Sequence, residues 1–306
     1  MPPAPEPVLY CLSYTALAEA WIGVERRKVT IRDLLEMKRN GRKIVAVSLY
    51  DYPTAFFAEK AGVDVILVGD GSVGMTALGY SSTVPVTMDE MVTFCKAVVR
   101  GAQHPLILAD MPFMSYQTVE EALRNAGRFM KKSGVDAVKL EGGKEVSDKV
   151  KAISEAGIPV IGHIGLTPQT ASLSGGYKIQ GKTSQSARGI VEDALTLESC
   201  GACALVLEFT TAEVAQIVSK KLAIPTVGWG SGPYCDGIGL NISDILGFSL
   251  GLTPKFAKQY ANLHDSMITA LSNYRKEVQE GKFPEEIHSI HMEKAEYESL
   301  LKDTAE

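Results

Sequence analysis

The sequence predicts a single main domain folded as a closed (β/α)8 TIM barrel, an α/β fold of eight parallel strands that alternate with helices. Short apolar runs of strand length alternate with amphipathic stretches from about residue 28 onward, an order typical of parallel sheets with right-handed crossovers. Seven or eight such units fit into about 225 residues, which favours a closed barrel over an open sheet. Polar residues recur where the apolar runs end, at the barrel face that carries functional sites in this fold.

The composition is that of a globular protein and excludes several classes of partner. The chain has 306 residues, 45% hydrophobic and 22% charged, with a net charge of −5. The acidic balance and the lack of a basic block argue against nucleic acid or an anionic membrane surface. No apolar run approaches the roughly 20 residues that span a bilayer. The five cysteines are few and scattered, so we expect reduced thiols and a cytoplasmic location.

Three segments are expected along the chain. Residues 1–27 are proline-rich and then mildly amphipathic, and we interpret them as an N-terminal extension. Residues 28–285 carry the barrel, and residues 286–306 form a charged C-terminal tail. Within the barrel segment, Pro254–Gly281 has the spacing of a long amphipathic helix.

The apolar runs predict seven strands and a final, less regular βα unit. The strands are expected at Lys43–Leu49, Val63–Val68, Pro105–Ala109, Val135–Glu141, Ile158–Gly162, Ala202–Leu207 and Ile224–Val227, and the final unit at Ile238–Leu252. Helices are expected at Pro53–Ala61, Thr87–Arg100, Thr118–Ser133 and Ser184–Cys200. Two more are expected, one that ends at about Ala156 and one that follows Thr210. Two of them open with a Thr-x-x-Glu capping box, at Thr87 and at Thr118.

The strand Val135–Glu141 carries charge that an ordinary core strand would not. Side chains alternate between the two faces of a strand, so Lys139 and Glu141 share one face while Val138 and Leu140 share the other. Uncompensated buried charge costs several kcal/mol. We therefore expect this pair to be engaged with other charges or with a ligand, although a plain structural ion pair would also fit.

Acidic residues and one histidine stand at the ends of five predicted strands. They are Asp70, Asp110, Glu141, His163 and Glu208. In a parallel barrel all these ends converge on one face. Clustered carboxylates cannot all stay ionised without cations, because each raises the pKa of the others. A divalent metal would resolve this, and ligation by oxygen alone favours Mg2+; a structural ring of acids is the alternative.

Nine short motifs follow one another in order along the barrel segment. They are Asp51-Tyr52, Leu67-Val-Gly-Asp70, Ser82-Thr-Val-Pro-Val86, Ala109-Asp-Met-Pro-Phe113, Val138-Lys-Leu-Glu-Gly-Gly143, Gly162-His-Ile-Gly-Leu-Thr-Pro-Gln169, Gly175-Gly-Tyr-Lys-Ile-Gln-Gly181, Leu205-Val-Leu-Glu208 and Pro254-Lys-Phe-Ala257. In these motifs the chain resembles the ketopantoate hydroxymethyltransferase family over about residues 28–285. The resemblance implies a (β/α)8 barrel of the phosphoenolpyruvate mutase/isocitrate lyase superfamily and a homo-oligomer, typically a decamer.

The resemblance also implies an activity and a substrate site. A hydroxymethyl group would pass from methylenetetrahydrofolate, the co-substrate, to C3 of 3-methyl-2-oxobutanoate through an Mg-stabilised enolate, giving ketopantoate for pantothenate biosynthesis. Asp70, Asp110 and Glu141 would surround the Mg2+ that chelates this 2-oxo acid. Lys139 and Ser72 would bind the same substrate, together with Asp70 and Asp110.

Three further residues receive roles from the same resemblance. Glu208 would be the general base that removes the proton at C3. His163 and Lys178, the latter in the Gly-rich loop, would order the substrate or the folate. A supporting or packing role for His163 remains an alternative.

Two regions depart from the family pattern. In the Gly69–Gly74 loop Gly71 is an extra residue, so Ser72 is displaced by one position. Within residues 209–244, Gly228-Trp-Gly-Ser-Gly232 stands where the family has Gly-Ile-Gly-Ala-Gly, and Trp229 would be either a lid or packing. These departures leave open a specialised paralogue that forms or cleaves a C–C bond on another 2-oxo acid or with another one-carbon donor. A non-catalytic oligomeric barrel is the remaining alternative.

Overall fold

A computed structural model describes residues 27–251 and 254–304 of the chain. The predicted extension at residues 1–27 therefore lies outside the described residues except for Arg27. The chain divides into two compact units, Met1–Ile242 and Ser243–Glu306, and each is described by itself.

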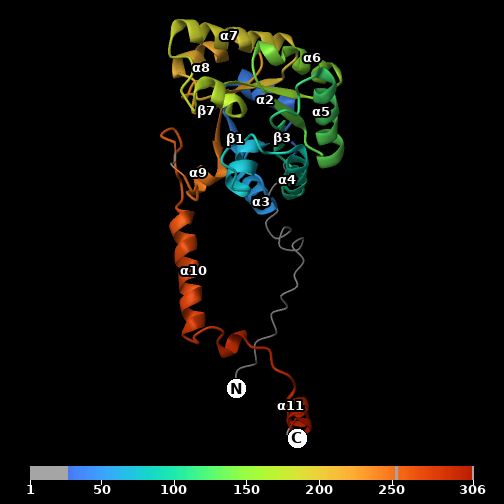
Figure 1. Cartoon of the computed structure of the whole chain (residues 1–306), viewed down its shortest axis with the longest axis vertical. Helices are drawn as coiled ribbons and strands as arrows, with labels where there is room; N and C mark the ends of the chain where they lie inside the picture. The colour runs from blue at the N-terminus through green and yellow to red at the C-terminus, as the bar shows by residue number, and fades with distance from the viewer. Residues whose placement is uncertain (1–26, 252–253, 305–306) are drawn as a thin grey trace. The chain divides into compact units, whose positions relative to one another are not determined.

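The first unit is a closed barrel of eight parallel strands, which confirms the predicted fold (Figure 1). Each strand is hydrogen-bonded to its neighbours in sequence, and β8 closes the ring onto β1. The strands are β1 (Ile44–Ser48), β2 (Val65–Val68), β3 (Leu106–Asp110), β4 (Ala137–Glu141), β5 (Val160–Gly165), β6 (Ala204–Glu208), β7 (Thr226–Trp229) and β8 (Gly237–Asn241).

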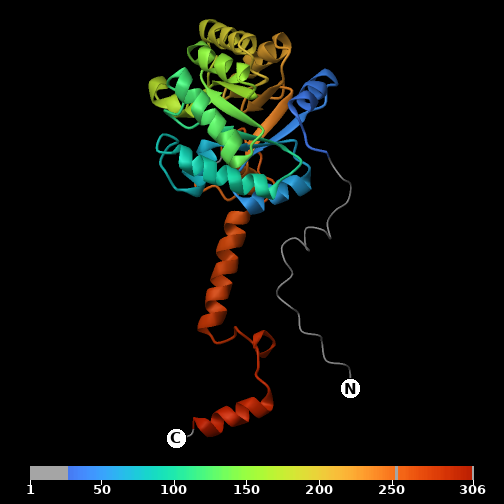
Figure 2. The same cartoon turned by 90° about the vertical axis from the view of Figure 1, so that its right-hand side faces the viewer.

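Helices connect most of the strands and lie around the outside of the barrel (Figure 2). They are α2 (Ile31–Arg39), α3 (Tyr52–Ala61), η1 (Ser72–Ala77), α4 (Met88–Gly101), α5 (Val119–Ser133), η2 (Lys144–Val146), α6 (Ser147–Glu155), η3 (Pro168–Ser174), α7 (Ser184–Ser199) and α8 (Ala212–Lys221). The capping boxes at Thr87 and Thr118 are both formed, as predicted. The short link between β7 and β8 contains no helix.

The barrel interior is apolar along most of its length. Alternate side chains of β1 to β7 form one buried cluster, which includes Ile44, Leu67, Leu108 and Ile161. Leu34 and Met37 of α2 belong to the same cluster, so this helix closes the N-terminal end of the barrel. Burial of such side chains is worth about 1.5–3 kcal/mol each, and the polar residues are left at the opposite end.

Trp229 is a packing residue of the barrel interior. Its side chain is 7% exposed and belongs to the apolar cluster. A Cβ atom built on Gly239 of β8 would overlap the indole ring. The ring therefore occupies space that the glycine on the neighbouring strand leaves free, which decides between the two roles considered for this residue.

The second unit consists of helices whose bounds differ from those expected. It contains most of α9 (Ile242–Leu246), then α10 (Leu263–Gln279), η4 (Glu286–His288) and α11 (Lys294–Asp303). The helix predicted from Pro254 begins only at Leu263, because the Tyr260 N–H donates to the carbonyl of Ile245 and Asn262 caps α10 instead. The tail at residues 286–306, expected only to be charged, includes α11.

In the described part of the chain, no helix combines the length and apolarity that crossing a membrane requires.

Candidate active site

The predicted polar residues meet at the carboxyl ends of the strands. In the register of the sheet, Asp110 lies beside Lys139 and Glu141 lies beside His163. Asp110, Glu141 and Glu208 are the last residues of their strands, whereas β5 continues two residues past His163. β3, β5 and β6 thus end one to three residues later than the apolar runs indicated, whereas β4 ends at Glu141 as predicted.

The buried ammonium of Lys139 lies at the centre of this group. Its Nζ is 2.7 Å from Asp110 Oδ1, 3.8 Å from Glu141 Oε1 and 2.8 Å from His163 Nδ1. Burial by itself would lower the pKa of Lys139, but Asp110, Glu141 and Asp70 raise it above its ordinary value. Lys139 is therefore a fixed positive charge, and the engagement expected for the Lys139–Glu141 pair is present.

His163 connects this charge to Glu208, and its tautomer follows from the geometry. An ammonium group can only donate, so Nδ1 of His163 accepts from Lys139 and the ring proton is on Nε2. Nε2 lies 3.1 Å from Glu208 Oε2, at ion-pair distance but without the alignment of a full hydrogen bond. The Glu208 side chain is 25% exposed, so its carboxylate can be reached by a small molecule.

The carboxylates of the site are not equally compensated. Burial, then Asp110 and Glu141, raise the pKa of Asp70 well above its usual range. Burial and Glu141 likewise raise the pKa of Asp110 in spite of Lys139. Burial opposes ionisation of Glu141 as well, but the Lys139 ammonium and the Gln169 N–H lower its pKa. Asp70 and Asp110 are thus the two acids that need a further cation.

The donor set fits a hard divalent cation. Asp70, Asp110 and Glu141 offer carboxylate oxygens, and these acids are buried in excess of Lys139. No group of three His, Cys, Asp or Glu side chains within residues 27–251 and 254–304 stands in a ligating arrangement. Mg2+ does not require one, because it is usually held by one or two carboxylates together with substrate oxygens and water.

Gln169 and Tyr116 belong to this site, although their side chains were not singled out from the sequence. The Gln169 Nε2 donates to Asp70 Oδ2 at 2.7 Å, and its backbone N–H donates to Glu141 Oε2 at 3.0 Å. The Tyr116 hydroxyl donates to Gln169 Oε1 at 2.6 Å. The one sequence signal for Gln169 is its position just beyond β5, in the motif shared with His163; Tyr116 has no comparable signal.

Ser72, which follows Gly71, begins a π-helical turn, η1. The Leu78 N–H bonds to the carbonyl of Val73, five residues back, instead of four. Such π-turns are frequent at functional sites. Ser72 is buried in this turn, and its hydroxyl lies 2.9 Å from that of Ser48 at the end of β1. Ser72 is therefore buried at the end of β1.

The Gly-rich loop is joined to the strand that carries Glu208. The backbone N–H of Gln180 donates to the carbonyl of Phe209 at 2.8 Å, and Phe209 itself adopts a left-handed conformation with φ of 51°. Lys178 is exposed, and its ammonium lies over Gly175 of its own loop. The described contacts do not bring Lys178 to the acidic group.

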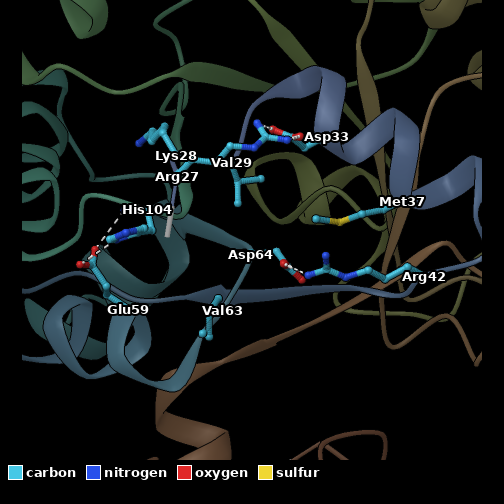
Figure 3. Close-up of a pocket in the computed structure, with 11 residues that line it drawn as sticks. Arg27, Lys28, Val29, Asp33, Met37, Arg42, Glu59, Val63, Asp64 and His104 are labelled. Atoms are coloured by element: carbon cyan, nitrogen blue, oxygen red, sulfur yellow. Dashed lines mark hydrogen bonds and ion pairs between the residues drawn. The ribbon is translucent and has the colours of Figure 1, made fainter. Parts of the chain in front are cut away.

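A cavity of about 450 Å3 lies at the other end of the barrel (Figure 3). It is lined by residues that precede β1, β2 and β3, among them Arg42, Asp64 and His104. Its charged side chains are joined in pairs, as the dashed lines in Figure 3 show for Arg42 with Asp64 and for His104 with Glu59. Barrels of this kind place their chemistry at the opposite face, so we assign this cavity no part in the site.

The fold and the polar strand ends define a closed parallel barrel of the kind found in enzymes. The barrel is similar to phosphonopyruvate hydrolase bound to oxalate and Mg2+, with a TM-score of 0.57 and 13% identity, covering 90% of this chain and 98% of that one. It is also similar to 2,3-dimethylmalate lyase, with a TM-score of 0.53 and 16% identity, covering 86% of this chain and 90% of that one.

The chain belongs to the ketopantoate hydroxymethyltransferase family, a family of transferases, as its motifs indicated. The sequence model of that family matches residues 28–286. The 3-methyl-2-oxobutanoate hydroxymethyltransferase of Heliobacterium modesticaldum is 50% identical, covering 87% of this chain and 97% of the relative. That of Moorella thermoacetica is 52% identical, covering 87% of this chain and 99% of the relative.

Proposed function

We propose that the protein transfers a hydroxymethyl group from methylenetetrahydrofolate to C3 of 3-methyl-2-oxobutanoate, giving ketopantoate for pantothenate biosynthesis. The observation that carries the proposal is the partly exposed carboxylate of Glu208, which His163 approaches from within the buried acidic group. Relatives about half identical in sequence bear the name of this activity.

Glu208 is the general base in this proposal. A carboxylate within reach of the C3 proton contributes about 10²–10⁴-fold to proton removal. His163 Nε2 lies 3.1 Å from one oxygen of Glu208, which leaves the other oxygen to accept the proton. Since Lys139 fixes the tautomer of His163, the orientation of the base is set by the same lysine that compensates the acids.

Asp70, Asp110 and Glu141 would hold Mg2+, with Asp70 and Asp110 as the acids that most need it. When bound, the ion would act as a Lewis acid on the keto oxygen of the substrate and make the C3 proton more acidic. Lys139 and Ser72, both buried beside these acids, would bind the 2-oxo acid. The Gly-rich loop, with Lys178, would contact the folate from the rim.

Exchange of the C3 proton of 3-methyl-2-oxobutanoate in D2O tests the proposal. With Mg2+ present, we expect exchange by the wild type, a loss of about 10²-fold or more in Glu208→Gln, and folate-dependent formation of ketopantoate. Glu192→Gln, an exposed glutamate of α7, is the matched control and should be unaffected. Exchange without ketopantoate would favour a paralogue with another donor, and a lack of exchange with any 2-oxo acid would favour a non-catalytic barrel.

We also propose a homo-oligomer. Strands of a parallel barrel are normally covered on the outside, yet the side chains of Val45 on β1 and Ile238 on β8 are 49% and 39% exposed. Along α10, Leu263, Met267 and Leu271 recur at helical spacing and are all exposed. A second copy of the chain would bury such surfaces. Light scattering should give a multiple of the monomer mass for the wild type and for Ser272→Lys, and a lower mass for Leu271→Lys.

The remaining assignments follow from the same family. We propose residues 28–285 as the catalytic segment, residues 1–27 as an extension and residues 286–306 as a tail. A cytoplasmic location is in keeping with the free thiols of Cys95, Cys200, Cys203 and Cys235. Fractionation of cells that produce the protein would test the location, and truncation at residue 27 should preserve C3 exchange.

A further inference from the structure

We propose that Gln169, held by Tyr116, is a positioning residue that sets the carboxylates of Asp70 and Glu141 for the metal ion. This inference rests on the proposed Mg2+ site and adds to it two residues that act through the ligands. Gln169 is 3% exposed and Tyr116 is 7% exposed, so both side chains are part of the barrel mouth.

The orientation of the Gln169 amide is determined by its partners. Its Nε2 lies 2.7 Å from Asp70 Oδ2 and 2.9 Å from the carbonyl of Met111, and a carbonyl oxygen can only accept, so the amide nitrogen faces this pair of oxygens. Its Oε1 lies 2.6 Å from the Tyr116 hydroxyl, which donates. All three polar positions of the amide are thereby used, and a flipped amide would lose at least two hydrogen bonds.

The same residue reaches a second acid through its backbone. The Gln169 N–H donates to Glu141 Oε2 at 3.0 Å, while the Tyr116 hydroxyl also lies 3.3 Å from the Glu141 carbonyl. Gln169 therefore fixes one oxygen of Asp70 and one oxygen of Glu141. The other oxygen of Asp70 is not used by Gln169 and can turn toward an ion.

The neutrality of Gln169 suits this task. Asp70 and Glu141 are both buried and Gln169 contacts both of them, so two like charges repel each other around this residue. A lysine at this position would relieve the repulsion but would compete with the metal for the same negative charge. An amide donates to the carboxylates without adding positive charge, so the site keeps its affinity for a cation.

The chain delivers Gln169 to the mouth through a sharp turn after β5. Gly165 has φ of +96°, and a Cβ atom there would overlap the Glu208 carbonyl. Pro168 then starts η3, so Gln169 lies in the first turn of this helix. Hydrogen-bonding partners of metal ligands typically change metal affinity by about 10–100-fold.

Titration calorimetry with Mg2+, and with Mn2+ as a second probe, tests the inference on the full chain without substrate. We expect Gln169→Ala to weaken binding of both ions about 10–100-fold, and Tyr116→Phe to weaken it by less. Gln185→Ala, an exposed glutamine of α7, is the matched control and should bind like the wild type. In turnover, Gln169→Ala should raise the Mg2+ concentration needed for half-maximal rate more than it lowers kcat at saturating Mg2+.

Unchanged affinity for both ions in a folded Gln169→Ala protein would overturn the inference. If Gln169→Ala does not fold, Tyr116→Phe decides in the same way, since it removes only one hydroxyl. A wild-type protein that binds neither ion would contradict the proposed metal site itself. Failure of the inference and failure of the proposed function are therefore distinguishable in one series of titrations.

Discussion

Acidic side chains are paired one to one with bases at one end of the barrel and outnumber the lysine beside them at the other. At the N-terminal end, each of four acids has its own base, in the pairs Arg27–Asp33, Lys28–Asp136, Arg42–Asp64 and His104–Glu59. At the C-terminal end, Asp70, Asp110 and Glu141 share the single ammonium of Lys139 and are almost fully buried. The matched end only has to be stable, whereas the unmatched end is suited to binding a cation.

Removing a base should therefore have very different effects at the two ends. Lys139→Met would leave buried acids without their cation and should lower the free energy of unfolding by about 3–5 kcal/mol. Arg42→Met removes a guanidinium that is 65% exposed and should cost less than about 1 kcal/mol. Urea unfolding of both variants in EDTA measures the difference. Equal losses of unfolding free energy in Lys139→Met and Arg42→Met would contradict the proposed difference between the two ends.

The apolar layers between the two ends should be sensitive to added volume at one glycine. Gly239→Ala would place a methyl group against the Trp229 indole and should destabilise the protein by about 1–3 kcal/mol. Gly189→Ala on α7, where a Cβ has nothing within 4 Å, should instead stabilise it by about 0.5–1 kcal/mol. Thermal unfolding of the two variants gives the sign. The destabilisation caused by Gly239→Ala should be smaller in a protein that also carries Trp229→Leu. An equal destabilisation with and without Trp229→Leu would contradict the packing role of Trp229.

Neutralising an acid should change stability with opposite signs at the two ends. Asp70→Asn removes one of several repelling buried carboxylates and should stabilise the metal-free protein, by about 1 kcal/mol. Asp64→Asn weakens the bonds that Asp64 accepts from Arg42 and from the Val45 N–H and should destabilise it by about 1–2 kcal/mol. Both are measured by denaturant unfolding in EDTA. A destabilised Asp70→Asn would mean that the acids are already compensated.

The smallest expected effect is a pH dependence at the N-terminal end. Burial alone would raise the pKa of Asp33, but hydrogen bonds from Thr30 and Arg27 outweigh it and lower this pKa to about 2. Because the unfolded value is about 3.9, the stabilisation is complete above pH of about 4 and is lost as the pH falls toward 2. Asp33→Asn weakens the hydrogen bonds that Asp33 accepts from Thr30 and should remove about 1 kcal/mol of stability at pH 7 together with this part of the acid dependence.

Unfolding measured between pH 2 and pH 6 distinguishes Asp33 from the acids of the mouth. Asp70 has a raised pKa, so its contribution in the metal-free protein is present at low pH and is lost as the pH rises. The difference between wild type and Asp33→Asn should therefore grow with pH, and that between wild type and Asp70→Asn should have the opposite sign. If the stabilities of the wild type and both variants changed with pH in the same way, the pKa shifts assigned to Asp33 and Asp70 would be wrong.

Several features could be predicted from the sequence because their causes are local. The capping boxes at Thr87 and Thr118 depend on residues three apart, and both are formed. The end of the chain was predicted less well. The apolar spacing from Pro254 to Gly281 continues through a segment in which the Tyr260 N–H donates to Ile245 of α9, and spacing alone cannot show that a backbone N–H has a partner elsewhere.

The alternation of side chains along β4 by itself determined that Lys139 and Glu141 face the same way, because a strand has a period of two residues. Only the closed barrel decided which residues these side chains contact. Gln169 reaches Asp70 across 99 positions of sequence, and Trp229 takes the space left by Gly239 on the next strand. Contacts of this kind depend on which strand ends the ring brings together, and short-range periodicity holds no information about that closure.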